Sequence, residues 1–291
     1  MREFDVAAPD GRTLRVHEGG ADDGFPVFVH HGTPSAGNLF RLWHEDAAGR
    51  GIRLLSHDRP GYGGSDRHEG RSVADVAADV RTIADDLGLD RIATWGGSGG
   101  GPHALACGAL MPERVTRVAT LAGVAPYGVP DLDFLAGMGK DNITEIGLAL
   151  NDRDGLRRLL GEWAEETLAT TPEHLYTTLE SLLSDADRAV LTGEVAEYMH
   201  ESSRLGLSRG IDGWFDDDLA FTRDWGFDVA DLSVPVLIWQ GNQDLMVPAS
   251  HGEWLGRHIP GADARVLGPE GHLTLIVNRV GETHAWLLAQ D

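Results

Sequence analysis

Short apolar runs that alternate with helical patterns restrict the fold of this sequence more than any other feature. Repeated strand and helix patterns form βαβ units, which build a parallel sheet with right-handed crossovers. Helices are expected from about Asn38, Ser72 and Gly99, and the runs predicted to be strands are "PVFVHHG", "IRLLSHDRPG", "RIATWGG" and "VTRVATLAG". Before them, alternating runs at 2–7 and 12–17 flank Asp10-Gly11, which favours a tight turn, so an antiparallel hairpin is expected to open the chain.

The alternation is interrupted once, because residues 125–231 carry helical patterns and no convincing strand. The pattern returns with "VPVLIWQG", a helix over 250–258, "ADARVLGPEG" and a final helix over 273–288. We therefore predict an α/β core formed by residues 1–124 and 232–291, with a helical cap inserted at 125–231.

Composition and charge exclude several classes of function. The 291 residues carry a formal net charge of −22, and no basic cluster is present, so nucleic acid is not an expected partner. No apolar run reaches the roughly 18 residues that a membrane span requires, and the N-terminus lacks the apolar core of a secretory signal. We expect no membrane association and a cytoplasmic location, with the single cysteine, Cys107, as a small core residue.

Five consecutive residues, Gly96-Gly97-Ser98-Gly99-Gly100, fit the pattern G-x-S-x-G where a predicted strand changes directly into a predicted helix. Such a turn strains its central residue, and side chains two positions before and after it would clash. Ser98 would then be exposed at a helix N-terminus, which favours developing negative charge. A phosphate-binding turn is the alternative, but no G-K-[ST] is present and the first strands form a hairpin.

A serine hydroxyl becomes a good nucleophile only when an imidazole takes its proton and a carboxylate orients that imidazole. Asp244 in "GNQDLMVP" follows the strand predicted near 236–239, and His272 in "GPEGHLTL" precedes the last helix. The order Ser98, Asp244, His272 favours these three as the catalytic residues. The competing residues fit less well: His103 and His284 lie within predicted helices, and Asp58 suits a turn cap.

The segment "HHGTPSAG" follows the strand that ends near residue 30. A loop at this place presents backbone N–H groups toward the carboxyl edge of the sheet, opposite the residue that follows the nucleophile. The N–H groups of Thr33 and Gly99 are therefore the predicted oxyanion hole.

The motifs "HHGTP", "DRPGYGGS", "GGSGG", "GNQDLMVP" and "GPEGHLTL" together resemble those of the α/β-hydrolases over nearly the full chain. The resemblance implies a mostly parallel eight-stranded sheet with flanking helices, a helical cap, and a site at the carboxyl edge of the sheet. Serine at position 98 differs from the aspartate of the haloalkane dehalogenase and epoxide hydrolase branches. The prolyl aminopeptidase branch shows His-Gly-Gly-Pro-Gly and Gly-Gly-Ser-Trp-Gly where this chain has "HHGTPS" and "GGSGGG".

The function expected from these residues is hydrolysis of a carboxylic ester or lactone of a small to medium, largely apolar molecule through an acyl-enzyme, without a cofactor or metal. C–C bond cleavage, prolyl aminopeptidase-like peptide cleavage and cofactor-free perhydrolysis use the same three residues and stay open. A ligand receptor with vestigial hydrolase activity is the alternative from another class. Four aromatic residues of the insertion are candidates either for an apolar pocket or for plain packing within the cap: Trp214, Phe215, Trp225 and Phe227.

Overall fold

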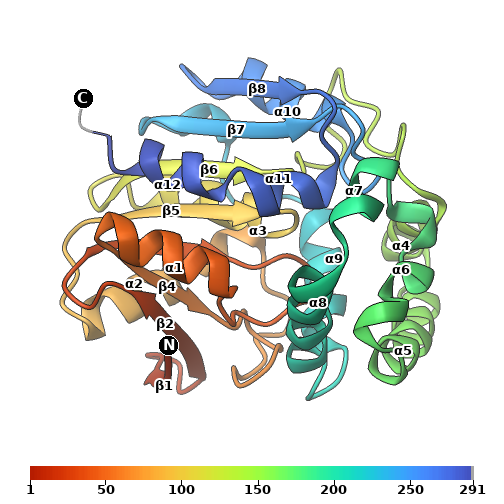
Figure 1. The fold of residues 1–291 in the computed structure, drawn as a ribbon, viewed down its shortest axis with the longest axis horizontal. Helices are drawn as coiled ribbons and strands as arrows, with labels where there is room; N and C mark the ends of the chain where they lie inside the picture. The colour runs from red at the N-terminus through yellow and green to blue at the C-terminus, as the bar shows by residue number, and fades with distance from the viewer. Residues whose placement is uncertain (290–291) are drawn as a thin grey trace.

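Eight strands form one sheet with helices on both faces in the computed structural model, which describes residues 1–289 (Figure 1). Their order across the sheet is β1-β2-β4-β3-β5-β6-β7-β8. β2 pairs antiparallel with both β1 and β4, and the other pairings are parallel, so the predicted fold class is confirmed. The strands are β1 Arg2–Ala7, β2 Thr13–Gly20, β3 Phe25–His30, β4 Ile52–His57, β5 Ile92–Gly97, β6 Val115–Leu121, β7 Val236–Gly241 and β8 Asp263–Leu267.

The helices that flank the sheet are α1 Arg41–Arg50, α2 Val76–Asp86, α3 Gly100–Leu110, α10 Ala249–His258, α11 His272–Asn278 and α12 Val280–Leu287. The expected single helix over 273–288 is wrong, because this part of the chain forms two helices, α11 and α12, which are separated at Arg279. Apolar residues of both α11 and α12 still pack on the sheet, so their spacing does not reveal a break of one residue.

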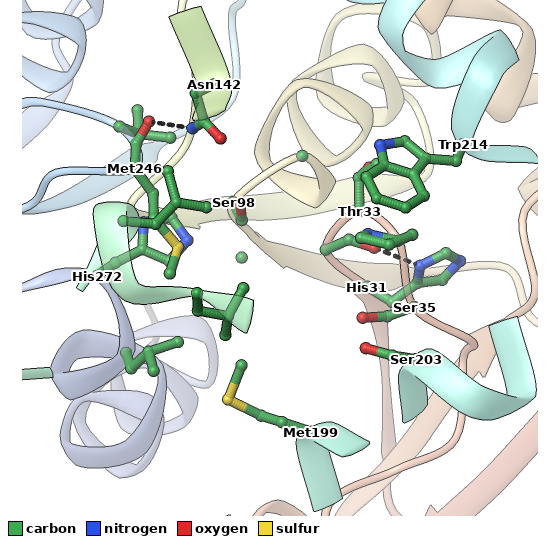
Figure 2. Close-up of a pocket in the computed structure, with 18 of the residues that line it drawn as sticks. His31, Thr33, Ser35, Ser98, Asn142, Met199, Ser203, Trp214, Met246 and His272 are labelled. Carbon is green, nitrogen blue, oxygen red and sulfur yellow. Dashed lines mark hydrogen bonds between the residues drawn. The ribbon is translucent and has the colours of Figure 1, made fainter. Parts of the chain in front are cut away.

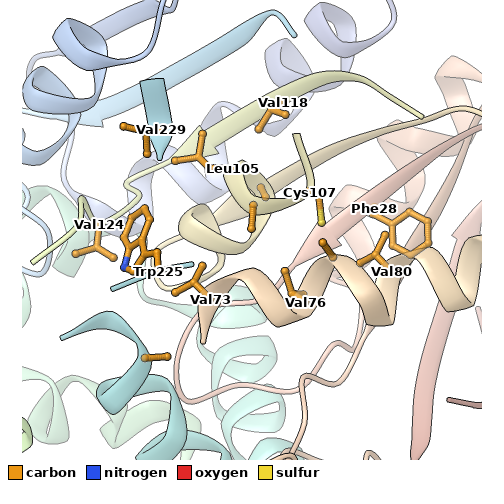
Figure 3. Close-up of a cluster of buried hydrophobic side chains, with 14 of the residues drawn as sticks. Phe28, Val73, Val76, Val80, Leu105, Cys107, Val118, Val124, Trp225 and Val229 are labelled. Carbon is orange, nitrogen blue, oxygen red and sulfur yellow. The ribbon is translucent and has the colours of Figure 1, made fainter. Parts of the chain in front are cut away.

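Two apolar layers cover the sheet, one on each face. Because successive side chains of a strand point to opposite faces, Phe28 packs with α2 and α3 while Val27 and Val29 pack with α1. Figure 3 shows the first layer, in which Cys107 is completely buried among valines and Phe28. This agrees with the prediction that Cys107 is a core residue.

The chain between β6 and β7 forms six α-helices and short 3₁₀ turns, and no strand, in residues 125–231, called here the inserted segment. These helices are α4 Lys140–Asn151, α5 Arg153–Ala169, α6 Leu175–Thr178, α7 Asp185–Val190, α8 Gly193–Gly206 and α9 Asp212–Phe221. They lie beyond the carboxyl ends of the parallel strands, at the arrowheads of β5 and β7 (Figure 1). Within residues 1–289, no helix combines the length and apolarity needed to cross a membrane.

Candidate active site

Ser98 occupies the turn between β5 and α3 with a positive φ of 53°. Its N–H donates to the carbonyl of Leu121 on the neighbouring strand at 2.9 Å. A Cβ on Gly96 would collide with the carbonyl of Gly100, and a Cβ on Gly100 would collide with the carbonyl of His30. The two glycines therefore allow the sharp turn that presents the Ser98 side chain.

The imidazole of His272 and the carboxylate of Asp244 are joined by a hydrogen bond of 2.8 Å between Nδ1 and Oδ2. The other carboxylate oxygen accepts the N–H groups of Met246 and Val247 at 2.8 Å each, which fixes its orientation. Since a carboxylate accepts, Nδ1 carries the proton and Nε2 is free to accept another. Burial lowers the pKa of His272, but the charge and hydrogen bond of Asp244 outweigh it, and the pKa lies above its usual value.

Thr33 and Gly99 lie next to each other in space. A Cβ atom placed on Gly99 would be only 2.6 Å from Oγ1 of Thr33. The Thr33 hydroxyl donates to Asp217 at 2.7 Å and accepts from Arg59 at 3.1 Å. Arg59 also donates to the carbonyl of His31 and pairs with Asp217 at 2.6 Å. The loop that carries Thr33 is therefore held by a buried ionic network reaching into α9, a role of the side chain that sequence reasoning missed.

A cavity of about 480 Å³ contains Ser98, His272, Thr33 and Gly99 in its wall, a volume typical of small-molecule sites. Figure 2 shows Ser98 and His272 together with residues of the inserted segment. Those labelled from the inserted segment are Asn142 of α4, Met199 and Ser203 of α8, and Trp214 of α9. Asn142 also donates to the carbonyl of Met246 at 3.0 Å, two residues after Asp244.

Of the four aromatic residues singled out in the inserted segment, Trp214 lines the cavity. Phe215 packs against residues of α5 and α9, and Trp225 belongs to the core beside α2 and α3 (Figure 3). Phe227 is partly buried and packs against that core. Hydrophobic spacing identifies these residues as buried but does not separate a cavity wall from a packed interior. Trp163 and Phe221, which sequence reasoning did not name, also line the cavity.

The alternatives to the proposed base and acid have other partners. Nδ1 of His103 lies 2.8 Å from the carbonyl of Gly99, and Nδ1 of His284 lies 2.7 Å from Asp46. Asp58 accepts the N–H groups of Gly37 and Gly64, as expected of a residue that caps a turn.

Asp187 in α7 is a further residue of the site that sequence reasoning missed. Its completely buried carboxylate accepts the N–H groups of His272 and Leu273 at 3.1 and 2.7 Å. It also accepts the hydroxyl of Ser184 at 2.7 Å. A Cβ on Gly271 would collide with the Asp187 carboxylate, which explains the glycine before His272. The only sequence signal for Asp187 is the S-x-x-D spacing from Ser184, which indicates a helix start and nothing about His272.

No group of three or more His, Cys, Asp or Glu side chains in residues 1–289 is arranged to hold a metal ion. The expectation that the protein uses neither metal nor cofactor stays a prediction.

A serine at a strained strand-to-helix turn, beneath helices inserted after β6, defines an α/β-hydrolase site. A model of the α/β hydrolase fold family matches residues 26–279, so the chain belongs to this family.

Two relatives differ in the activities that their names give. The 2-hydroxy-6-oxononadienedioate/2-hydroxy-6-oxononatrienedioate hydrolase of Burkholderia vietnamiensis is 26% identical over 90% of this chain and 86% of its own. The non-heme chloroperoxidase of Streptomyces lividans is 26% identical over 84% of this chain and 83% of its own. An esterase from Exiguobacterium antarcticum has a similar structure, with a TM-score of 0.72 and 22% identity over 99% of this chain and 100% of that chain. The structural similarity to this esterase bears on the fold alone.

Proposed function

We propose that this protein is a serine hydrolase that cleaves a carboxylic ester or lactone of a small to medium, largely apolar substrate. Ser98 attacks the carbonyl carbon, while Nε2 of His272 takes the hydroxyl proton and later returns it to the leaving alcohol. Asp244 holds the imidazole in the required tautomer. Water then hydrolyses the acyl-enzyme by the same route. The observation that supports this most strongly is that Ser98, at positive φ, shares one cavity with the His272 that Asp244 orients.

The tetrahedral intermediate carries a negative oxygen that needs backbone donors. The N–H groups of Thr33 and Gly99 are proposed for this role, since the two residues are adjacent and border the cavity beside Ser98. The inserted segment is proposed to act as a cap, because its helices supply much of the cavity wall and thus the contacts that select a substrate.

Hydrolysis of a dioate, the activity named for the Burkholderia relative, is less well supported. A dioate carries two carboxylates, whereas four acidic side chains line the cavity. Within the described part of the chain, no Lys or Arg lines it. Like charges repel more strongly in a poorly solvated site, so an ester or lactone fits better than a dianion. The four acidic residues are Asp141, Glu145, Glu166 and Asp218.

Covalent labelling and turnover test the proposal together. An organophosphonate is expected to label Ser98 alone, and p-nitrophenyl butyrate and small lactones are expected to be hydrolysed. Ser98→Ala should abolish labelling and lower kcat by about 10⁴ to 10⁶, whereas the exposed control Ser208→Ala should change neither. Full labelling of Ser98→Ala would assign the nucleophile to another residue. Tight ligand binding without turnover by the unmodified protein would instead support the receptor alternative.

A further inference from the structure

Two acidic side chains from different helices of the inserted segment meet in the wall of the cavity. Glu145 on α4 and Asp218 on α9 are hydrogen-bonded to each other, and both line the cavity. The indole N–H of Trp214 donates to Oε1 of Glu145 at 2.5 Å. Asp218 is 3% exposed, and apart from a proton shared with Glu145 no donor in residues 1–289 reaches its buried Oδ2.

The charged groups around this pair do not neutralise it. Burial and the Glu145 carboxylate hold the pKa of Asp218 well above its usual value, and the nearby Asp217 adds to this shift. Arg71 acts in the opposite direction, but its guanidinium forms an ion pair with Asp217 at 2.7 Å. Burial, helped by the charge of Asp141, raises the pKa of Glu145 to about 7. The pair therefore shares a proton and gains a net negative charge around neutral pH.

Buried carboxyl oxygens that lack hydrogen-bond donors destabilise a fold. Unsatisfied groups of this kind are found mainly at functional sites, where a bound ligand can supply the missing donor. An ionised carboxylate only accepts hydrogen bonds, so the missing group must be a donor. Since no Lys or Arg of the described chain lines the cavity, a cation balances the charge better than a neutral donor.

Aromatic side chains next to the pair suit the same kind of ligand. Trp214 contacts Glu145 through its indole N–H, and its ring lies 6.2 Å from that of Trp163, centroid to centroid. Both tryptophans line the cavity. The faces of indole rings attract cations, and they also pack against the alkyl groups of an amine.

We propose that Glu145, Asp218 and Trp214 form a subsite for an ammonium group carried by the substrate. The inference rests on the proposed function, because it assigns the substrate class of the same cavity: an ester or lactone whose apolar body bears an amine. The ammonium donates to the carboxyl pair, the indole faces contact its alkyl carbons, and the ester carbonyl is left for Ser98.

Binding to the Ser98→Ala protein tests the subsite without requiring turnover. The probes are n-butylammonium and 1-butanol, which have the same chain length and differ in charge, and binding is followed by calorimetry near pH 8. We expect n-butylammonium to bind at least about tenfold more tightly than 1-butanol. Glu145→Gln and Asp218→Asn should each remove most of this preference while leaving the affinity for 1-butanol within about twofold. Glu165→Gln, an exposed charge on α5, is the control that should retain it.

The pH dependence provides a measurement that needs no change to the acidic pair. An alkylammonium stays protonated between about pH 6 and 8, so any change in its affinity reports on the protein. Affinity for n-butylammonium should rise over this range as the pair loses the first of its two protons and becomes negatively charged, and affinity for 1-butanol should stay flat. This pH experiment remains informative even if Glu145→Gln or Asp218→Asn fails to fold. A thermal melt of each variant shows whether it has folded.

Equal binding of the two probes, a flat pH response, or a preference that survives in folded Glu145→Gln or Asp218→Asn would overturn the subsite. Failure of the proposed function has a different signature, because the ammonium preference would persist while the unmodified protein neither hydrolyses esters nor is labelled at Ser98.

Discussion

Asp187 connects a single residue of the inserted segment to the backbone that carries His272. Because its carboxylate accepts three consecutive N–H groups at the start of α11, those of residues 272–274, it fixes the direction in which the imidazole leaves the chain. Its charge also contributes to the raised pKa of His272, after the larger effect of Asp244. Asp187 is therefore a positioning residue, which acts through His272 and not on the substrate.

Replacing Asp187 should change both the rate of ester hydrolysis and the pH dependence of kcat/KM. Asp187→Ala should lower kcat/KM about tenfold, which corresponds to about 1.4 kcal/mol in the activation free energy, because the backbone that positions the imidazole of His272 loses its acceptor. Asp187→Asn keeps an acceptor and should recover part of that rate. In both variants the acid limb of kcat/KM should move to lower pH, because removing the negative charge lowers the pKa of His272.

Asp185→Ala is the matched control, because Asp185 is exposed on the same helix α7. It should leave the rate and the acid limb unchanged. A purely structural role for Asp187 would lower the rate of Asp187→Asn without moving its acid limb, and that outcome would contradict the assignment.

At the scale of the element, the β5–α3 turn depends on glycine at two positions for steric reasons. Gly100→Ala forces a Cβ into the carbonyl of His30, so β3 or α3 must shift. We expect a destabilisation of about 1–3 kcal/mol in urea unfolding, together with slower organophosphonate labelling of Ser98.

Gly147→Ala is the matched control within a helix. Nothing lies within 4 Å of a Cβ at Gly147, so this change should stabilise the protein by about 0.5–1 kcal/mol and leave labelling unchanged. Undiminished labelling and stability in Gly100→Ala would show that the turn tolerates a side chain there.

At the scale of the whole molecule, one buried network joins the inserted segment to the loop that follows β4. Asp217 of α9 pairs with Arg59 and Arg71 and accepts the hydroxyl of Tyr62 at 2.8 Å. Burial raises the pKa of Asp217, but the two arginines outweigh it and hold the pKa well below its usual value. Asp217 thus contributes stability above its unfolded pKa of about 3.9, and this contribution is lost as the pH falls through its lower folded pKa.

Removing that charge leaves two buried guanidinium groups without their partner. Asp217→Asn should therefore lower the free energy of unfolding at pH 7 by about 3–5 kcal/mol in urea titrations. The difference from the unmodified protein should shrink below about pH 4, where Asp217 of the unfolded chain takes up a proton. Asp212→Asn, a partly exposed charge on the same helix, should cost less than about 1 kcal/mol. Equal losses in the two variants would argue that the buried network does not hold the inserted segment in place.

Local patterns in the sequence predicted the alternating strands and helices of the core, the strained turn at Ser98, and the places of Asp244 and His272 after the ends of strands. Each of these depends on residues close together in the chain, through hydrophobic spacing, steric limits on glycine and the geometry of strand ends. The tertiary structure alone decided that Asp187 reaches His272 across 85 positions and that Glu145 meets Asp218 in the cavity wall. These contacts depend on how the inserted helices pack over the sheet. The chain contains 46 Asp and Glu residues. Until that packing is known, nothing in the sequence distinguishes an acidic residue that lies in the site from one that lies on the surface.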